Sequence, residues 1–138
     1  MRMGPLLFLA LALAPVAETG SQTAQPMPGA FLVEPIAERR VARLPDGPLY
    51  WHIETFPTLA AARAAEGPLS LAAGHAGRAW LFTLGPAAAA TRGGTPVRPI
   101  GPVPVVDASE YLLRVNRAGG PPGAMTSVHS HAGSEAFY

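Results

Sequence analysis

Sixteen prolines and 15 glycines divide the 138 residues into short segments bounded by turns. Hydrophobic residues make up 49% of the chain and charged residues only 14%, a composition typical of a globular protein and unlike that of a disordered one. A chain of this length has room for one domain. We therefore expect one compact, mainly β domain that is rich in turns.

Two segments have the residue pattern of strands. Residues 49–56 (LYWHIETF) are rich in aromatic and β-branched side chains and lie between two prolines. Residues 110–117 (EYLLRVNR) alternate apolar and more polar positions, the period-2 pattern of a strand that faces a core. Large aromatic side chains at strand spacing are expected in that core rather than in a ligand platform: Trp51, Trp80, Phe82 and Tyr111.

A short helix and a hairpin are expected between these two strands. Thr58 can cap a helix within residues 58–66, whose alanines favour close packing on a sheet. The apolar runs 69–73 and 78–84 are separated by a Gly-containing loop, which is the spacing of an antiparallel hairpin. Residues 85–104 are dominated by Pro, Gly and Ala and predict a long loop with extended stretches.

The charged residues and the absence of cysteine exclude several functions. Ten basic and nine acidic residues give a formal net charge of +1 without a long single-sign run, so no footprint for nucleic acid is visible. Glu38, Arg39, Arg40 and Arg43 are expected to form a solvated surface. Without cysteine, the chain has no disulfides, thiolate zinc sites or cysteine nucleophiles. Any metal must therefore be held by histidine and carboxylate side chains.

The first residues resemble an export signal. Arg2 precedes an uninterrupted apolar run, Leu6–Ala14, that is far shorter than the roughly 20 residues needed to span a bilayer. This pattern predicts a signal peptide within residues 1–24, cleaved between Ala17 and Ala24, and a periplasmic or extracellular protein without a stable membrane anchor. The alternative is a buried N-terminal helix. Residues 25–48 are then expected to be a lead-in to the main domain.

Two histidines and a glutamate near the C-terminus have the spacing expected of a metal site. His129 and His131 are two residues apart, so on a strand both imidazoles point to the same face. Glu135 follows four residues later, and a tight turn between them would bring its carboxylate towards the imidazoles. Two imidazoles and a carboxylate suit a divalent transition metal ion, which can be Fe, Mn, Ni, Cu or Zn. We expect His129, His131 and Glu135 to be metal ligands; the alternative is a polar surface strand and turn.

Together with Gly123, these residues form the pattern G-x5-H-x-H-x3-E. This pattern resembles the first signature motif of the cupin superfamily, and GSEAFY after the histidines resembles a small single-domain bacterial cupin. The resemblance implies a double-stranded β-helix barrel over residues 49–138, with the metal near its axis, and a homodimer. In that family, His129, His131 and Glu135 would be the first three ligands.

The family's second motif, which supplies a fourth ligand histidine, is absent from these 138 residues. Residues 135–138 have the pattern of a strand that has just begun. We therefore expect this sequence to be an incomplete cupin barrel, with the fourth ligand beyond Tyr138.

The other candidate residues have simpler explanations. His52 lies on an expected strand and could be an extra ligand, but a packed or solvated histidine is the preferred interpretation. His75 is expected at the surface in a turn. Ser127 and Ser130 flank the histidines, yet no Asp is placed to orient a catalytic base, so a serine hydrolase is not favoured.

Two functions from different classes remain open. The first is a metal-dependent enzyme that acts on a small molecule, of the dioxygenase, isomerase or decarboxylase type, with an oxygenase-like enzyme weakly favoured. The second is a non-catalytic module that binds a small molecule, in which the metal only organises the pocket. The fold does not choose between them.

Overall fold

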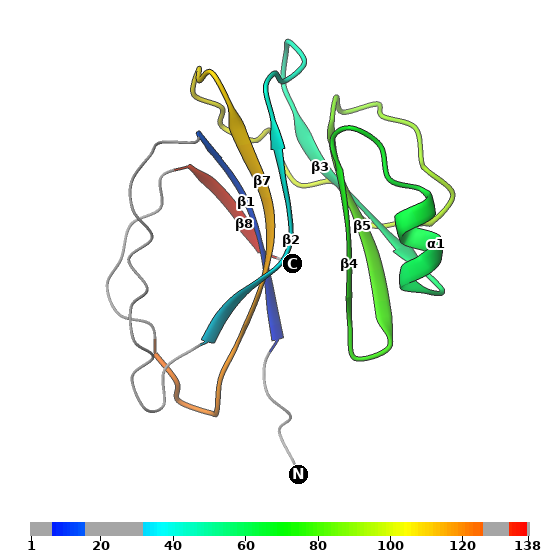
Figure 1. Ribbon diagram of the computed structural model, residues 1–138, viewed down its shortest axis with the longest axis vertical. Helices are drawn as coiled ribbons and strands as arrows, with labels where there is room; N and C mark the ends of the chain where they lie inside the picture. The colour runs from blue at the N-terminus through cyan, green and yellow to red at the C-terminus, as the bar shows by residue number, and fades with distance from the viewer. Residues whose placement is uncertain (1–6, 16–31, 126–132, 138) are drawn as a thin grey trace.

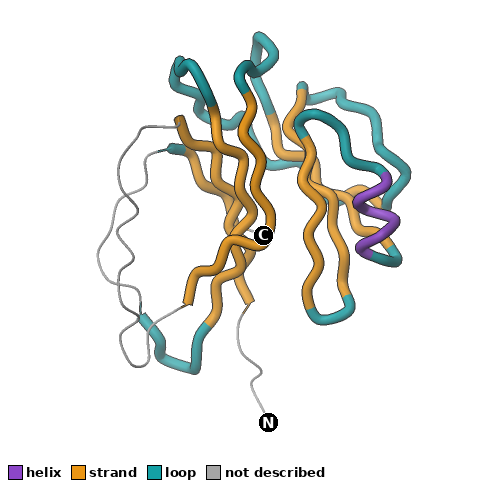
Figure 2. The backbone as a smooth tube through the Cα atoms, in the orientation of Figure 1, coloured by secondary structure: helices purple, strands orange, loops and turns teal. Residues whose placement is uncertain are grey.

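The computed structural model describes residues 7–15, 32–125 and 133–137. The described part of the protein is mainly β and has one short helix. The described strands form two four-stranded antiparallel sheets that face each other, and a short helix lies on the far side of the second sheet (Figure 1 and Figure 2). The prediction of a mainly β fold with one short helix is confirmed at this level.

The first sheet has the strand order β2-β7-β1-β8. Its strands are β2 (Leu32–Val41), β7 (Tyr111–Gly119), β1 (Leu7–Pro15) and β8 (Ser134–Phe137). The alternation predicted for residues 110–117 is confirmed, because alternate side chains in the first part of β7 are buried against the second sheet: Tyr111, Leu113 and Val115.

Strand β1 occupies an interior position of the first sheet. It pairs with β7 along its whole length, from Leu7 opposite Gly119 to Pro15 opposite Tyr111, and with β8 on its other side. Leu11 and Leu13 are buried in the core. The alternative of a buried N-terminal helix is therefore wrong, because this segment is a strand. The signal peptide stays a prediction. A cut between Ala17 and Ala24 would remove β1 from between β7 and β8.

Strand β2 lies within residues 25–48, which were expected to be a lead-in. It pairs with β7, and the register shifts at Pro35, where a bulge accommodates the missing N–H. Pro35 and the charged residues after it conceal the strand pattern in the sequence. Proline is tolerated here because β2 is an edge strand of its sheet.

The second sheet has the strand order β4-β5-β3-β6. Its strands are β4 (Ser70–His75), β5 (Arg78–Gly85), β3 (Tyr50–Phe56) and the two-residue β6 (Thr95–Pro96). The predicted strand and hairpin are confirmed. The β4–β5 hairpin turns through Ala76 and Gly77, which both have positive φ, as a two-residue turn that matches the twist of the strands requires.

Helix α1 (Leu59–Ala64) confirms the predicted short helix. The Thr58 side chain accepts a hydrogen bond from the Ala61 N–H at 3.1 Å, which is the expected N-cap. Small side chains let the helix approach the outer face of the second sheet closely, in a cluster of Ala62, Ala72, Ala79 and Leu81.

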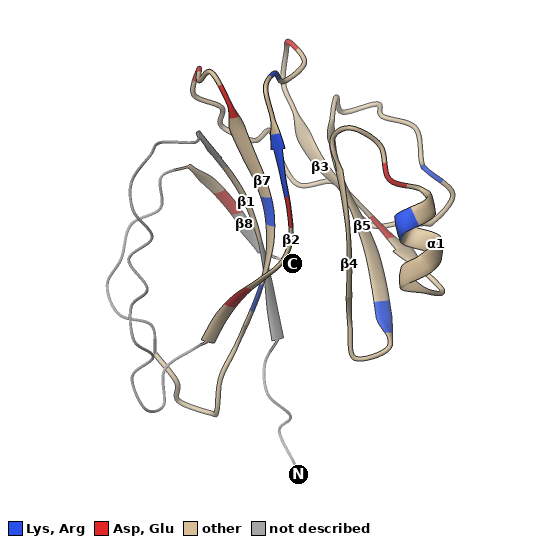
Figure 3. Ribbon diagram, in the orientation of Figure 1, with Lys and Arg blue, Asp and Glu red and all other residues tan. Residues whose placement is uncertain are grey.

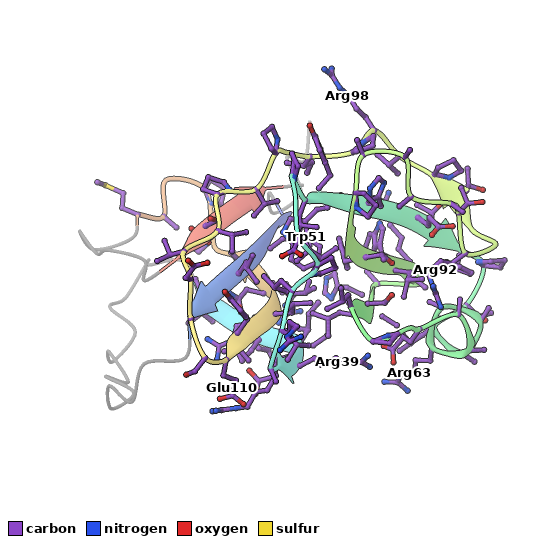
Figure 4. The ribbon with its side chains drawn as sticks, turned by 90° about the horizontal axis from the view of Figure 1, so that it is seen from above. Arg39, Trp51, Arg63, Arg92, Arg98 and Glu110 are labelled. Atoms are coloured by element: carbon purple, nitrogen blue, oxygen red, sulfur yellow. The ribbon has the colours of Figure 1, made fainter. Side chains whose placement is uncertain are left out.

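The main core lies between the two sheets. It includes Leu11, Leu13, Leu113 and Val115 from the first sheet, and Trp51, Ile53, Trp80 and Phe82 from the second. Figure 4 shows Trp51 between the sheets and Arg98 pointing away from the body. The predicted aromatic core is confirmed, because Trp51, Trp80, Phe82 and Tyr111 are all buried.

The two sheets approach each other along one side, where β2 contacts β4. On the other side, the segment 97–104 runs along β3: Ile100 exchanges backbone hydrogen bonds with Trp51, and the Val103 N–H donates to the Leu49 carbonyl at 2.7 Å. The Ser134 hydroxyl then donates to the Pro104 carbonyl. This segment therefore links the edge of the second sheet to β8, the strand that carries Glu135.

Candidate functional site

Glu135, the third predicted ligand, lies on the edge strand β8, where its position is fixed by pairing with β1. It is half-buried and stands opposite Ala12, while its neighbour Ser134 stands opposite Leu13. Directly paired residues of an antiparallel sheet point to the same face. Because Leu13 is in the core, Ser134 is on the inner face of the first sheet and Glu135 on the outer face.

The other two predicted ligands, His129 and His131, lie outside the described residues, as do Ser127 and Ser130. Gly123, the first position of the motif, has φ +80°, a conformation that favours glycine. Within residues 7–15, 32–125 and 133–137, no group of three or more His, Asp or Glu side chains could hold a metal ion. Of the three predicted ligands, the structure therefore describes only Glu135.

The chemistry of the donor set fits a divalent transition metal. Two neutral imidazoles and a carboxylate supply three donors and leave coordination positions open. Glu135 is the second residue of β8, the strand that follows the bend at Gly133, so the carboxylate is held on a regular element. The strand predicted at residues 135–138 is confirmed by β8 as far as Phe137, and Tyr138 lies outside the described residues.

His52 and His75 are both engaged in hydrogen bonds within the fold. His52 donates through Nε2 to the Pro86 carbonyl at 2.7 Å, which agrees with a packed histidine. His75 was expected on the surface of a turn, but it is the last residue of β4 and is half-buried. Its Nδ1 accepts from Arg117 at 3.2 Å, and Arg117 also donates to Glu34 at 2.7 Å. His75 thus links β4 to β7, and His52 links β3 to the loop that follows β5.

The arginine-rich part of β2 is more than a solvated surface. Arg40 and Glu38 form exposed ion pairs with Glu110 and Arg114, and Figure 3 shows these charges along β2 and β7. Arg39 differs, because it reaches the loop between α1 and β4 of the second sheet.

Arg39 donates to the Gly67 carbonyl and to Glu66 at 3.2 Å. The other oxygen of Glu66 accepts the Ala72 N–H at 2.7 Å. Arg39 therefore links the two sheets, and the prediction of a purely solvated cluster is wrong at this residue.

A mainly apolar pocket opens on the inner side of the first sheet. Its volume is about 340 Å³. We call it the Tyr111 pocket, and it is lined by Leu13, Pro104, Val105, Val106, Tyr111, Gly133 and Ser134. Sequence reasoning missed this pocket, because its residues come from three separate segments. Placing them together requires the pairing of β1 with both β7 and β8.

Comparison with known proteins finds no family model, no curated protein and no solved structure that matches this chain. The cupin resemblance therefore rests on residues 123–138. Among the described residues, no helix is both long enough and apolar enough to span a bilayer.

Proposed function

We propose that this protein is a metal-binding cupin-domain protein in which His129, His131 and Glu135 hold one divalent transition metal ion. The observation that carries the proposal is the spacing Gly123-x5-His129-x-His131-x3-Glu135, which combines two imidazoles and a carboxylate at intervals suited to one site. The position of Glu135 on the regular strand β8 supports it, and because Glu135 is on the outer face of the first sheet, the ion would lie outside the space between the two sheets. The favoured activity is an oxygenase-like reaction on a small molecule.

The bound metal would supply Lewis-acid or redox chemistry at its open coordination positions. The chain itself would hold the ion and orient its ligands. A carboxylate on a hydrogen-bonded strand loses less freedom on binding than one on a loop. Neutral imidazoles are required for coordination, so the site would operate where both histidines are deprotonated at the metal-binding nitrogen.

The second candidate function, a non-catalytic binding module, is favoured by one specific observation. Among the described residues, the Tyr111 pocket is lined mainly by apolar side chains and by no acidic residue, histidine or lysine. Such a lining suits retention of a molecule, because apolar side chains with a few placed polar groups are typical of binding pockets, and Tyr111 is the titratable side chain among the described lining residues.

Metal content tests the proposed ligands. The purified protein should retain roughly one divalent ion per chain, and His129→Ala, His131→Ala and Glu135→Gln should each lower retention. His75→Ala and Glu38→Gln are matched controls, because these residues make contacts elsewhere in the fold. Equal occupancy in all six proteins, measured by elemental analysis, would overturn the ligand assignment.

Oxygen consumption separates the enzyme from the binding module. The protein should be loaded in turn with Fe(II), Mn(II), Ni(II) and Cu(II), and oxygen uptake should be followed against a panel of small substrates. Uptake that depends on both metal and substrate, and that is lost in Glu135→Gln, supports an oxygenase. Saturable binding of small molecules without turnover under all four metals supports the module.

A further inference from the structure

We infer that the Tyr111 pocket is a binding site for a small, uncharged, mainly apolar molecule that carries one hydrogen-bond acceptor. The pocket's volume of about 340 Å³ lies at the lower end of the range for small-molecule sites. It would accommodate a molecule with one or two rings. The inference does not depend on the proposed metal.

The inner end of the pocket is part of the folded core. Leu13 on β1 and Tyr111 on β7 are buried, and they lie diagonally across the pair of strands on the same face of the sheet. The outer wall is formed by Val105 and Val106, whose exposed fractions are 41% and 70%. Two adjacent apolar side chains therefore stand in solvent beside a cavity that an apolar ligand would fill.

The hydroxyl groups of the pocket determine which ligand it suits. The Tyr111 oxygen accepts the Ala108 N–H at 3.0 Å, so the hydroxyl proton remains able to donate. In the part of the chain that the structure describes, no acceptor for this proton is found. Ser134 already donates its proton to the Pro104 carbonyl. The Tyr111 hydroxyl is thus a side-chain donor for a ligand, and with no formally charged side chain among the described lining residues the pocket favours an uncharged ligand that carries an acceptor.

The pocket and the proposed metal ligand lie on opposite faces of β8. Ser134 contributes to the pocket from the inner face, whereas Glu135 pairs with Ala12 on the outer face. Binding in the pocket is therefore expected to persist after the metal has been removed. A test on metal-free protein keeps the failure of this inference distinct from the failure of the proposed function.

The probe for this test is prodan, an uncharged naphthalene with a carbonyl acceptor and environment-sensitive fluorescence. Full-length protein, shown by mass to retain Leu13, is treated with a chelator and titrated with prodan. We expect a saturable blue shift with a Kd of roughly 10–100 µM, given the size of the probe. Val105→Trp should weaken binding at least about tenfold by filling the pocket.

Val33→Trp is the matched control, because Val33 is an exposed valine on the edge strand β2. It should bind prodan as the unaltered protein does. Equal binding by Val105→Trp, or no saturable binding by the unaltered protein, would overturn the inference.

Tyr111→Phe tests the donor. It should weaken prodan binding by about two- to tenfold, as expected for one hydrogen bond, and leave binding of 2-ethylnaphthalene, which lacks the carbonyl, unchanged. Equal losses for both probes would contradict the hydrogen bond to the ligand. Thermal unfolding of each variant confirms that the fold is intact.

Discussion

The carboxylate of Glu54 accepts the backbone N–H of Gly94 at 3.0 Å, and the same oxygen accepts the N–H of Arg92 at 2.8 Å. Glu54 is on β3 and only 3% exposed. One buried side chain therefore satisfies two backbone donors of the long loop after β5, and it fixes that loop beside the sheet.

Replacing Glu54 should destabilise the fold strongly. Glu54→Ala leaves both N–H groups without their acceptor and opens a cavity, so the free energy of unfolding should fall by about 2–4 kcal/mol. Glu54→Gln keeps one carbonyl acceptor and should cost less, about 1–2 kcal/mol. Urea unfolding followed by tryptophan fluorescence measures both values. Equal stability of Glu54→Ala and the unaltered protein would contradict this role.

Gly94 should tolerate no side chain. A Cβ at this position would lie 2.6 Å from a ring carbon of Phe56 and 2.8 Å from the Thr55 carbonyl oxygen. Gly94→Ala should therefore lower stability by about 1–3 kcal/mol, as expected for overpacking. Gly77→Ala is the control for a strained backbone in open space, because Gly77 has φ +76° and nothing within 4 Å of its added Cβ. It should cost about 1 kcal/mol, and Gly94→Ala should exceed it.

Arg39 and Arg40 are neighbours in the sequence with different expected contributions. Arg39→Met removes the half-buried link to Gly67 and Glu66 and should lower the free energy of unfolding by about 1–3 kcal/mol. Arg40→Met removes only an exposed ion pair with Glu110 and should cost about 0–1 kcal/mol. Thermal and urea unfolding compare the two. A larger loss of unfolding free energy in Arg40→Met than in Arg39→Met would contradict the role given to Arg39.

The strands that bury one face against the core could be predicted from the sequence. The strands β2 and β1 could not, because one is an edge strand and the other is defined by its pairing with distant residues. Residues 49–56 and 110–117 have aromatic and alternating patterns, and both form strands. β2 was missed because Pro35 and the charged residues after it do not form the apolar pattern of a core strand, and only the position of β2 at the edge of the sheet accommodates them. The apolar run at the N-terminus has the composition of a leader, and only its pairing with β7 shows a strand.

The proposed metal ligands could be predicted from their spacing in the sequence. The Tyr111 pocket and the contacts of Glu54 could not, because they depend on long-range contacts. His129, His131 and Glu135 stand within seven residues of one another, so a sequence motif can identify them. The Tyr111 pocket and the loop anchor at Glu54 join residues that are about 40 to 120 positions apart. No local pattern predicts such contacts, because they depend on the register of the sheets.

Acid should release the metal. Coordination requires neutral imidazoles, and protons compete for the same nitrogen atoms once the pH falls below the ordinary imidazole pKa of about 6.5. Retained metal should therefore fall as the pH is lowered from about 7 to 4 and recover after back-titration with added metal. Elemental analysis after gel filtration at each pH measures this. Retention that stays constant over the range would contradict histidine ligation.

Residues 7–15 have the sequence of a signal peptide but form the strand β1. Export as proposed from the sequence would cut between Ala17 and Ala24 and remove β1. The loss takes Leu11 and Leu13 out of the core, leaves one edge of β7 unpaired and removes the strand with which β8 pairs. Unpaired sheet edges beside exposed apolar surface promote association between chains.

A chain beginning at Gln25 should therefore be insoluble or oligomeric in size-exclusion chromatography, whereas a chain beginning at Leu6 keeps β1 and should elute as the full chain does. Within the full chain, Leu11→Ala should lower the free energy of unfolding by about 2–5 kcal/mol, because Leu11 is fully buried. The N-terminal mass of the exported protein tests the cut itself. If the chain beginning at Gln25 is monomeric and unfolds as cooperatively as the full chain, β1 contributes nothing essential to the domain, and this prediction is wrong.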